Sequence, residues 1–128
     1  MKFASIIVLC ILLPQSHTNL INSVWTHKIT KSANNTLTFK CNGLVLEYDC
    51  ELDYSFHSSY KISGDTITIS GKDDSHSEDG GKINSYWIST YVVRGDGLYM
   101  IKNKVSDHGT WKVYKVENSQ RPDYTKIR

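Results

Sequence analysis

Apolar and polar side chains alternate along residues 44–57, and this alternation is the clearest pattern in the chain. Every second position holds an apolar or sulfur-bearing side chain, namely Leu44, Leu46, Tyr48, Cys50, Leu52, Tyr54 and Phe56. The intervening positions are mostly polar: Val45, Glu47, Asp49, Glu51, Asp53, Ser55 and His57. Because neighbouring side chains of a β-strand point to opposite faces, the pattern predicts an extended segment with the first set on a core and the second set in water.

The same period of two recurs and predicts further strands. These cover residues 24–30, 36–41, 60–69, 83–93, 98–102 and 110–116, and the long segment 44–57 is expected to bend near residues 49–53. Two residue pairs are typical of two-residue hairpin turns, Asn42-Gly43 and Gly64-Asp65. The second turn would place Ile62 opposite Ile67, so turn chemistry and apolar pattern agree there.

These strands indicate the fold class and the domain organisation. About eight short strands at hairpin spacing, with no helical period of useful length, indicate an all-β domain that is either a closed barrel or a sandwich. Sequential hairpins without a long crossover favour an antiparallel up-and-down barrel, because closure removes exposed strand edges. We therefore predict a barrel over residues 19–116, followed by a polar, loose C-terminal tail at residues 117–128. Residues 71–82 contain no apolar side chain and are expected to form a solvated loop.

The first 18 residues are typical of a secretory signal peptide. Lys2 supplies a positive charge, and residues 3–13 form an apolar run that is too short for a membrane-spanning helix, which needs about 20 residues. Ser16 and Thr18 are small residues in a cleavage zone. Cys10 lacks the small preceding residue of a lipoprotein signal, so we expect no lipid anchor. The protein is thus predicted to be secreted or periplasmic, without a membrane span.

Removal of this signal leaves two cysteines, Cys41 and Cys50. An even pair of cysteines in an exported protein usually forms a disulfide. A tight turn at Asn42-Gly43 would instead place Cys41 opposite Leu44, with Cys50 about 20 Å further along the strand and out of disulfide reach. Two alternatives follow: a wider turn with a Cys41–Cys50 disulfide, which export favours, or a tight turn with two buried free thiols.

Three segments in the first half of the chain carry a family resemblance. They are Asn22-Ser23-Val24-Trp25, the run Leu37-Thr38-Phe39 followed by Asn42-Gly43, and residues 60–69 with the sequence YKISGDTITI. In this order they resemble small secreted lipocalin-like (calycin-type) barrel domains, over roughly residues 20 to 116. The lipocalin signature has a glycine two residues before the tryptophan, where this chain has Ser23. The resemblance implies a barrel that can enclose a cavity, and it implies no particular ligand.

The inward-facing residues of such a barrel form the candidate ligand site. An eight-stranded barrel either holds one small ligand or is filled by its own side chains, and large aromatic rings favour filling. If the interior is hollow, the residues expected to line the cavity are Leu46, Tyr48, Leu52, Tyr54, Phe56, Tyr86 and Ile88.

The net charge and the remaining motifs give no support for nucleic-acid binding, catalysis or metal binding. The formal net charge is +2 with both signs interspersed, which argues against a nucleic-acid partner. No metal-ligand spacing, phosphate-binding loop or nucleophile elbow occurs, so no catalytic residue, metal or cofactor is predicted. The acidic run at residues 73–79 lacks the order of an EF-hand calcium loop, and a turn explains Arg94-Gly95-Asp96. The acidic residues of segment 44–57 are expected on a solvated face.

A non-catalytic binding protein is therefore the leading functional hypothesis, with a small apolar or amphipathic ligand inside the barrel. The alternative is a protein-interaction or inhibitor module, in which the barrel is filled and the loops at residues 71–82 and 94–97 are functional. A deep pocket would favour the first hypothesis. An exposed aromatic patch around Trp87 and Tyr91 would favour the second.

Overall fold

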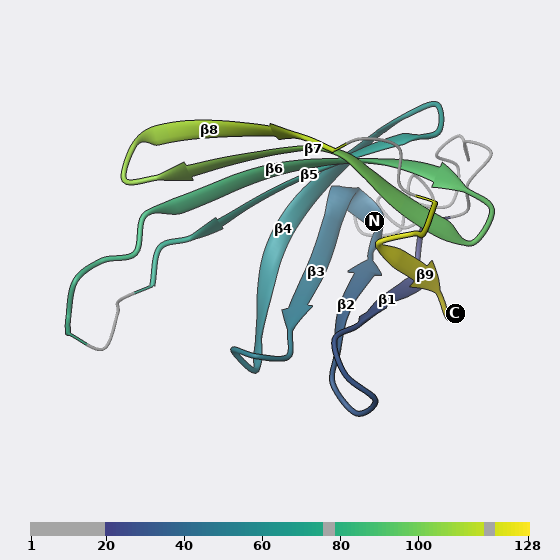
Figure 1. Ribbon diagram of the computed structural model, residues 1–128, viewed down its shortest axis with the longest axis horizontal. Helices are drawn as coiled ribbons and strands as arrows, with labels where there is room; N and C mark the ends of the chain where they lie inside the picture. The colour runs from purple at the N-terminus through teal and green to yellow at the C-terminus, as the bar shows by residue number, and fades with distance from the viewer. Residues whose placement is uncertain (1–19, 76–78, 117–119) are drawn as a thin grey trace, which may run out of the picture.

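The computed structural model describes residues 20–75, 79–116 and 120–128, so the predicted signal peptide lies outside the described residues. Within these described residues, the fold consists of nine strands and one short 3-10 turn (Figure 1). The strands are β1 (Val24–Lys28), β2 (Asn34–Phe39), β3 (Leu44–Asp49), β4 (Tyr54–Ser63), β5 (Thr66–Asp73), β6 (Ser85–Arg94), β7 (Gly97–Asp107), β8 (Thr110–Lys115) and β9 (Tyr124–Lys126).

Eight of these strands close into an antiparallel barrel, as the sequence predicted. Strands β1 to β7 follow one another as a meander in which each strand pairs with the next. Strand β9 then lies between β1 and β7 and completes the ring. The predicted fold class, an all-β up-and-down barrel of about eight strands, is confirmed.

The strand that closes the ring lies in the segment predicted to be a loose tail, and that prediction is wrong. Thr125 pairs with Thr26 of β1 on one side and with Gly97 of β7 on the other. The Asp123 carboxylate accepts a hydrogen bond from the Met100 amide at 2.7 Å, which fixes the approach to β9. A strand of three residues shows too little alternation to be recognised in a polar segment.

The turn between β2 and β3 also differs from the expected hairpin. It contains three residues, Cys41–Gly43, and is closed by the Lys40 amide, which donates to the Leu44 carbonyl at 2.8 Å. Asn42 and Gly43 both adopt positive φ, a conformation that these two residue types accept most readily. The wider turn pairs Phe39 with Val45 and shifts the register by one residue from the expected pairing.

This one-residue shift turns every side chain of β3 to the opposite face. Val45 is fully buried, whereas Leu44 is 38% exposed. Leu44 and Leu46 of the predicted inward set therefore face outward, and Glu47 of the predicted solvated set faces inward. A single turn residue thus decides which side chains the barrel encloses.

The two cysteines are free, so the preferred prediction of a disulfide is wrong. Cys41 lies in the β2–β3 turn at one end of the hairpin. Cys50 follows β3 at the other end, where its amide donates to the Asn35 side chain at 2.9 Å. The six residues of β3 separate the cysteines, which is about 20 Å in a strand, and both thiols are half-buried rather than fully buried.

The β4–β5 hairpin follows the predicted register. Ile62 pairs with Ile67 and Tyr60 pairs with Ile69 across the turn at Gly64, which has positive φ. Ile67 and Ile69 are fully buried. The predicted solvated loop after this hairpin starts later than expected, because β5 continues through Asp73 and pairs its last residues with the start of β6.

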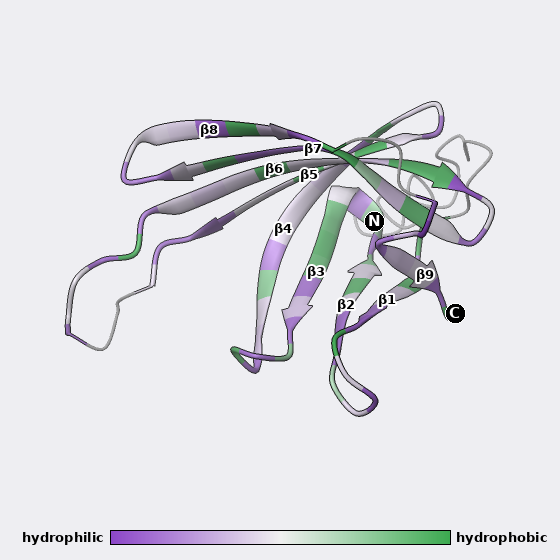
Figure 2. Cartoon of the chain, viewed as in Figure 1, coloured by the Kyte–Doolittle hydropathy of each residue, from purple (hydrophilic) through white to green (hydrophobic). Residues whose placement is uncertain are grey.

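The apolar core fills only one end of the barrel. Its members lie where β1, β3, β5 and β7 begin and where β2, β4 and β6 end: Leu20, Trp25, Leu37, Phe39, Val45, Tyr60, Ile67, Ile69, Tyr91, Val93 and Leu98. Figure 2 shows the division along single strands, since β3 is hydrophobic near its start and hydrophilic near its end. Trp25 is fully buried, and its indole nitrogen donates to the Ser23 hydroxyl at 2.8 Å.

Strands β5 to β8 extend beyond the ring as a sheet, seen at the left of Figure 1. The first residues of β7 pair with β9, and residues 102–107 pair with β8. All six residues of β8 are exposed, including Trp111, Val113 and Tyr114. Among the described residues, no helix has the length and apolar character needed to cross a membrane.

Candidate ligand-binding site

The opposite end of the barrel from the core contains a pocket of about 390 Å³ that opens to solvent. The end of β3 and the start of β4 form one wall, and the end of β5 and the start of β6 form another. Its lining residues are Asn35, Glu47, Tyr48, Asp49, Leu52, Phe56, Asp73, Ile83, Ser85, Trp87 and Tyr124. The barrel is therefore filled at one end and hollow at the other.

Trp87 occupies the inner wall of this pocket because its neighbour on β5 is a glycine. Gly71 pairs with Trp87 across β5 and β6, and a Cβ atom at residue 71 would lie only 2.3 Å from indole Cε2. The indole thus lies directly against the backbone of β5. Its edge-to-face partner is Phe56 of β4, with ring centroids 5.2 Å apart. The two rings together form the aromatic part of the lining.

Glu47 places a carboxylate inside the barrel beside these rings. The Ser58 hydroxyl donates to Glu47 Oε2 at 2.5 Å, and the Trp87 indole nitrogen donates to the same oxygen at 2.9 Å. Burial raises the pKa of Glu47 above its ordinary value, and the hydrogen bonds from Ser58 and Trp87 oppose that rise. Because burial has the larger effect on the pKa, the ionised carboxylate loses more free energy of hydration than these two hydrogen bonds restore.

The second carboxylate oxygen, Glu47 Oε1, has no hydrogen-bond donor among the described residues. Within that part of the chain, no fully buried side-chain oxygen lacks a partner, so Oε1 is in contact with the solvent of the pocket. Tyr124 lies near this carboxylate: burial and the negative charges of Glu47, Asp123 and Asp49 raise its pKa, so its hydroxyl stays protonated. The pocket thus offers a free acceptor atom on Glu47, and the neutral Tyr124 phenol belongs to the same lining.

Two further carboxylates stand at the mouth of the pocket, and each also stabilises a turn. Asp49 Oδ1 accepts hydrogen bonds from the amides of Glu51 and Leu52. Asp73 Oδ1 accepts hydrogen bonds from the amide and hydroxyl of Ser75, at 3.0 Å and 2.6 Å. The described residues of the pocket lining include no lysine, arginine or histidine, so together they carry a negative formal charge.

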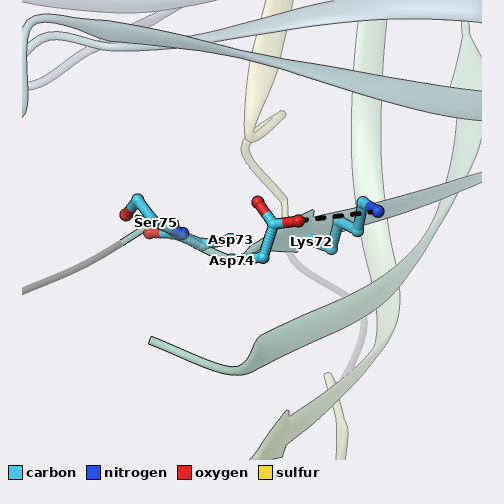
Figure 3. Close-up of polar contacts among 4 residues, drawn as sticks. All are labelled: Lys72, Asp73, Asp74 and Ser75. Atoms are coloured by element: carbon cyan, nitrogen blue, oxygen red, sulfur yellow. Dashed lines mark hydrogen bonds and ion pairs between the residues drawn. The ribbon is translucent and has the colours of Figure 1, made fainter. Parts of the chain in front are cut away.

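The loop beyond Asp73 points its charges into solvent. Figure 3 shows Asp74 directed at Lys72, and the two exposed side chains form an ion pair of 3.7 Å. Residues 76–78 of the predicted acidic loop lie outside the described residues. In the described part of the chain, no three histidine, cysteine, aspartate or glutamate side chains are grouped so that they could hold a metal ion.

The structure brings together three of the seven residues predicted to line a cavity. Tyr48, Leu52 and Phe56 line the pocket. Tyr54 lies beside it in a smaller hollow that also contacts Leu52 and Phe56, and its ring packs on Phe56. Whether any of these residues binds a ligand stays a prediction.

The other three predicted lining residues lie apart from this pocket. Tyr86 is 42% exposed and contributes to a separate hollow with Leu44. Leu46 and Ile88 occupy the outward positions of β3 and β6, next to the inward residues Glu47 and Trp87. The register of β3 and the inward position of Trp87 account for this difference.

Glu47, Trp87 and Tyr124 are among the lining residues that sequence reasoning missed. The prediction that Glu47 lies on a solvated acidic face is wrong. The structure also shows no exposed patch formed by Trp87 and Tyr91, the observation that would have favoured a protein-interaction module. Trp87 is half-buried and Tyr91 is buried. One signal could have indicated the correct face of β3: Val45 shares its face with Glu47, and valine is among the residue types most often fully buried.

Comparisons with protein-family models, with curated proteins and with solved structures find no match to this chain. The closed eight-stranded antiparallel barrel is consistent with a lipocalin-like fold, and the pocket at its open end is where such a barrel can hold a small molecule.

Proposed function

We propose that this protein is an exported, non-catalytic, lipocalin-like binding protein that carries a small amphipathic ligand. The observation that carries this proposal is the half-filled barrel, with a pocket of about 390 Å³ opposite a packed apolar core. This volume falls within the range of small-molecule sites, which is roughly 300–1,000 Å³. A core that closes one end gives the pocket a floor, so a ligand would enter and leave through the other end.

The lining favours an amphipathic ligand over a purely apolar one. Leu52, Phe56, Ile83 and Trp87 supply apolar surface, and Glu47 supplies a polar group at depth. Ligand sites of this kind combine apolar walls with a few placed polar groups that fix the orientation of the ligand. The predicted signal peptide supports export, where a carrier would meet such a molecule.

Native mass spectrometry of the mature protein, purified from its export compartment, tests the carrier proposal. We expect an additional small mass that is lost on denaturation. Ser85→Tyr places a ring at the pocket lining and should abolish the bound mass, whereas Ser59→Tyr, at an exposed position of β4 away from the pocket, should retain it. If the bound mass persists in the Ser85→Tyr variant, the ligand occupies another place and the proposal is wrong.

A second candidate function is the binding of a protein partner at β8. This strand pairs only with β7 in the part of the chain that the structure describes, so its other edge can accept a further strand. Lys112 and Lys115 favour an acidic extended segment. A peptide of alternating glutamate and valine should then protect the β8 amides from hydrogen exchange, and unchanged exchange rates would contradict this function.

A further inference from the structure

We propose that the ligand is a small organic cation, an amine attached to an apolar or aromatic group, and that Glu47 binds its ammonium group. This inference rests on the proposed carrier function and specifies the chemistry of the ligand. The apolar part of the molecule would lie against Phe56 and Trp87. The ammonium group would reach the free carboxylate oxygen at the inner end of the pocket.

The first support is the unbalanced charge of the pocket. Glu47, Asp49 and Asp73 are acidic, and no basic side chain is present among the lining residues that the structure describes. Asp49 and Asp73 already stabilise turns, whereas Glu47 projects into the barrel interior. A mostly buried carboxylate without a cationic neighbour is costly, and a bound cation would offset that cost.

The second support is the arrangement of donors around Glu47. Both donors, from Ser58 and Trp87, reach Oε2, and Oε1 remains in contact with pocket solvent. An ammonium group carries only donors, so it suits this free acceptor. The Tyr124 hydroxyl provides a second oxygen in the same region, and its high pKa keeps it neutral.

The third support is the aromatic wall beside the carboxylate. Trp87 donates its indole N–H to Glu47, so its ring is held next to the charged group. Phe56 meets this ring edge to face. Aromatic faces attract cations as well as apolar groups, and the attraction is greatest for tryptophan. The same pocket therefore matches both halves of an amphipathic amine.

Other ligand classes fit this site less well. An anion would face three carboxylates, which would repel it. A neutral apolar ligand that displaced water from Glu47 would leave Oε1 without a hydrogen bond, and an unpaired buried acceptor of this kind is costly.

Calorimetric titration with three phenyl compounds of similar size tests the inference: 2-phenylethylamine, 2-phenylethanol and 3-phenylpropionate. Wild-type protein should bind the amine at least about tenfold more tightly than the alcohol, as expected for a hydrogen bond to a charged group. The propionate should give no measurable heat. Glu47→Gln should remove the preference for the amine, and Glu51→Gln, the same change at an exposed loop position, should retain it.

The alcohol separates failure of this inference from failure of the carrier function. Equal affinity for amine and alcohol in wild-type protein would overturn the cation assignment and leave the carrier function intact. An amine preference that survives in Glu47→Gln would also overturn it. If none of the three compounds binds, and Ser85→Tyr also leaves any bound native mass unchanged, both proposals fail. Alcohol binding by Glu47→Gln shows that the variant pocket is folded.

Discussion

At the scale of single residues, the interior is organised by a carboxylate, an indole and a glycine. Glu47, Gly71 and Trp87 lie on β3, β5 and β6, and the Trp87 indole connects them: it covers the glycine and donates to the carboxylate. Sequence pattern cannot reveal such an arrangement, because it depends on contacts between β3, β5 and β6. A polar residue at an inward position, such as Glu47, interrupts the alternation of apolar and polar residues from which the inward face of a strand is predicted.

Replacement of Glu47 by glutamine should make the protein less sensitive to pH. The pKa of Glu47 is raised in the folded state, so the folded protein holds this proton more tightly than the unfolded chain does. The stabilisation that comes from this proton is complete at pH values below the ordinary carboxyl pKa. It is lost as the pH rises through the raised pKa that Glu47 has in the folded protein. We therefore expect Glu47→Gln to exceed wild type in free energy of unfolding at pH 7, with a smaller difference at pH 4.

Urea denaturation from pH 3 to pH 8 measures this effect. Asp49, Asp73, Tyr91 and Tyr124 also face this region, so the comparison must be between variants and not between pH values alone. Glu51→Gln serves as the control and should follow the wild-type profile. A difference between Glu47→Gln and wild type that is the same at every pH would contradict the assignment.

Gly71→Ala should destabilise the barrel by about 1–3 kcal/mol, the usual cost of an added methyl group in a filled space. The new Cβ would overlap the Trp87 ring, and the indole would have to leave Glu47 to avoid it. Because Gly71 does not have positive φ, this contact accounts for the cost without a contribution from backbone strain. In a Trp87→Phe background the smaller ring should relieve the clash, so the two changes should not be additive in denaturation experiments.

At the scale of secondary-structure elements, prediction succeeded where turn chemistry and apolar pattern agree. The β4–β5 hairpin is such a case, since Gly64 suits the turn and the isoleucines fall on one face. It failed at the β2–β3 hairpin, where Asn42-Gly43 fits both a two-residue turn and a three-residue turn. The choice between these turns depends on which face of β3 can be buried, and that is a property of the whole barrel. Strand β9 was missed because its pairing partners, β1 and β7, are distant in sequence.

Strands β9 and β8 should differ sharply in their importance for stability. Tyr124 of β9 packs against the core and meets Tyr91 with ring centroids 6.1 Å apart. Tyr114 of β8 is 53% exposed. We expect Tyr124→Ala to cost about 2–4 kcal/mol in free energy of unfolding and Tyr114→Ala to cost less than about 0.5 kcal/mol.

Chemical denaturation of the two alanine variants checks this contrast. The matched tyrosine-to-alanine change removes the same atoms at both places, so a difference reports on the position of the strand. Equal losses in free energy of unfolding would mean that β8 stabilises the barrel as much as β9 does. That result would contradict the prediction, which rests on the exposure of all residues of β8.

At the scale of the whole molecule, sequence predicted the closed barrel and its strand number but not how its interior is divided. The count of eight was reached with residues 110–116 as the last barrel strand, whereas that place belongs to β9. On each strand, only a few side chains belong to the packed core at one end of the barrel or to the pocket at the other end. Three of the seven predicted lining residues line the pocket, because the β3–β4 end of the barrel was located correctly even though the face of β3 was not.

Separation of the cysteines across the molecule gives a further expectation. Cys41 and Cys50 lie at opposite ends of β3 and are both half-buried. The folded protein should therefore keep two free thiols under oxidising conditions. Alkylation after denaturation should add two labels to the intact mass of the mature chain, and a mass deficit of two hydrogens without labelling would contradict the structure.

The position of β9 also decides when the barrel and its pocket can be completed. Because β9 follows every other barrel strand in the chain, β1 and β7 keep unpaired edges during synthesis until β9 has emerged. The pocket is incomplete until then, since Tyr124 of β9 forms part of its wall. If the protein carries a ligand as proposed, loading therefore has to wait until β9 has been made and has paired with β1 and β7.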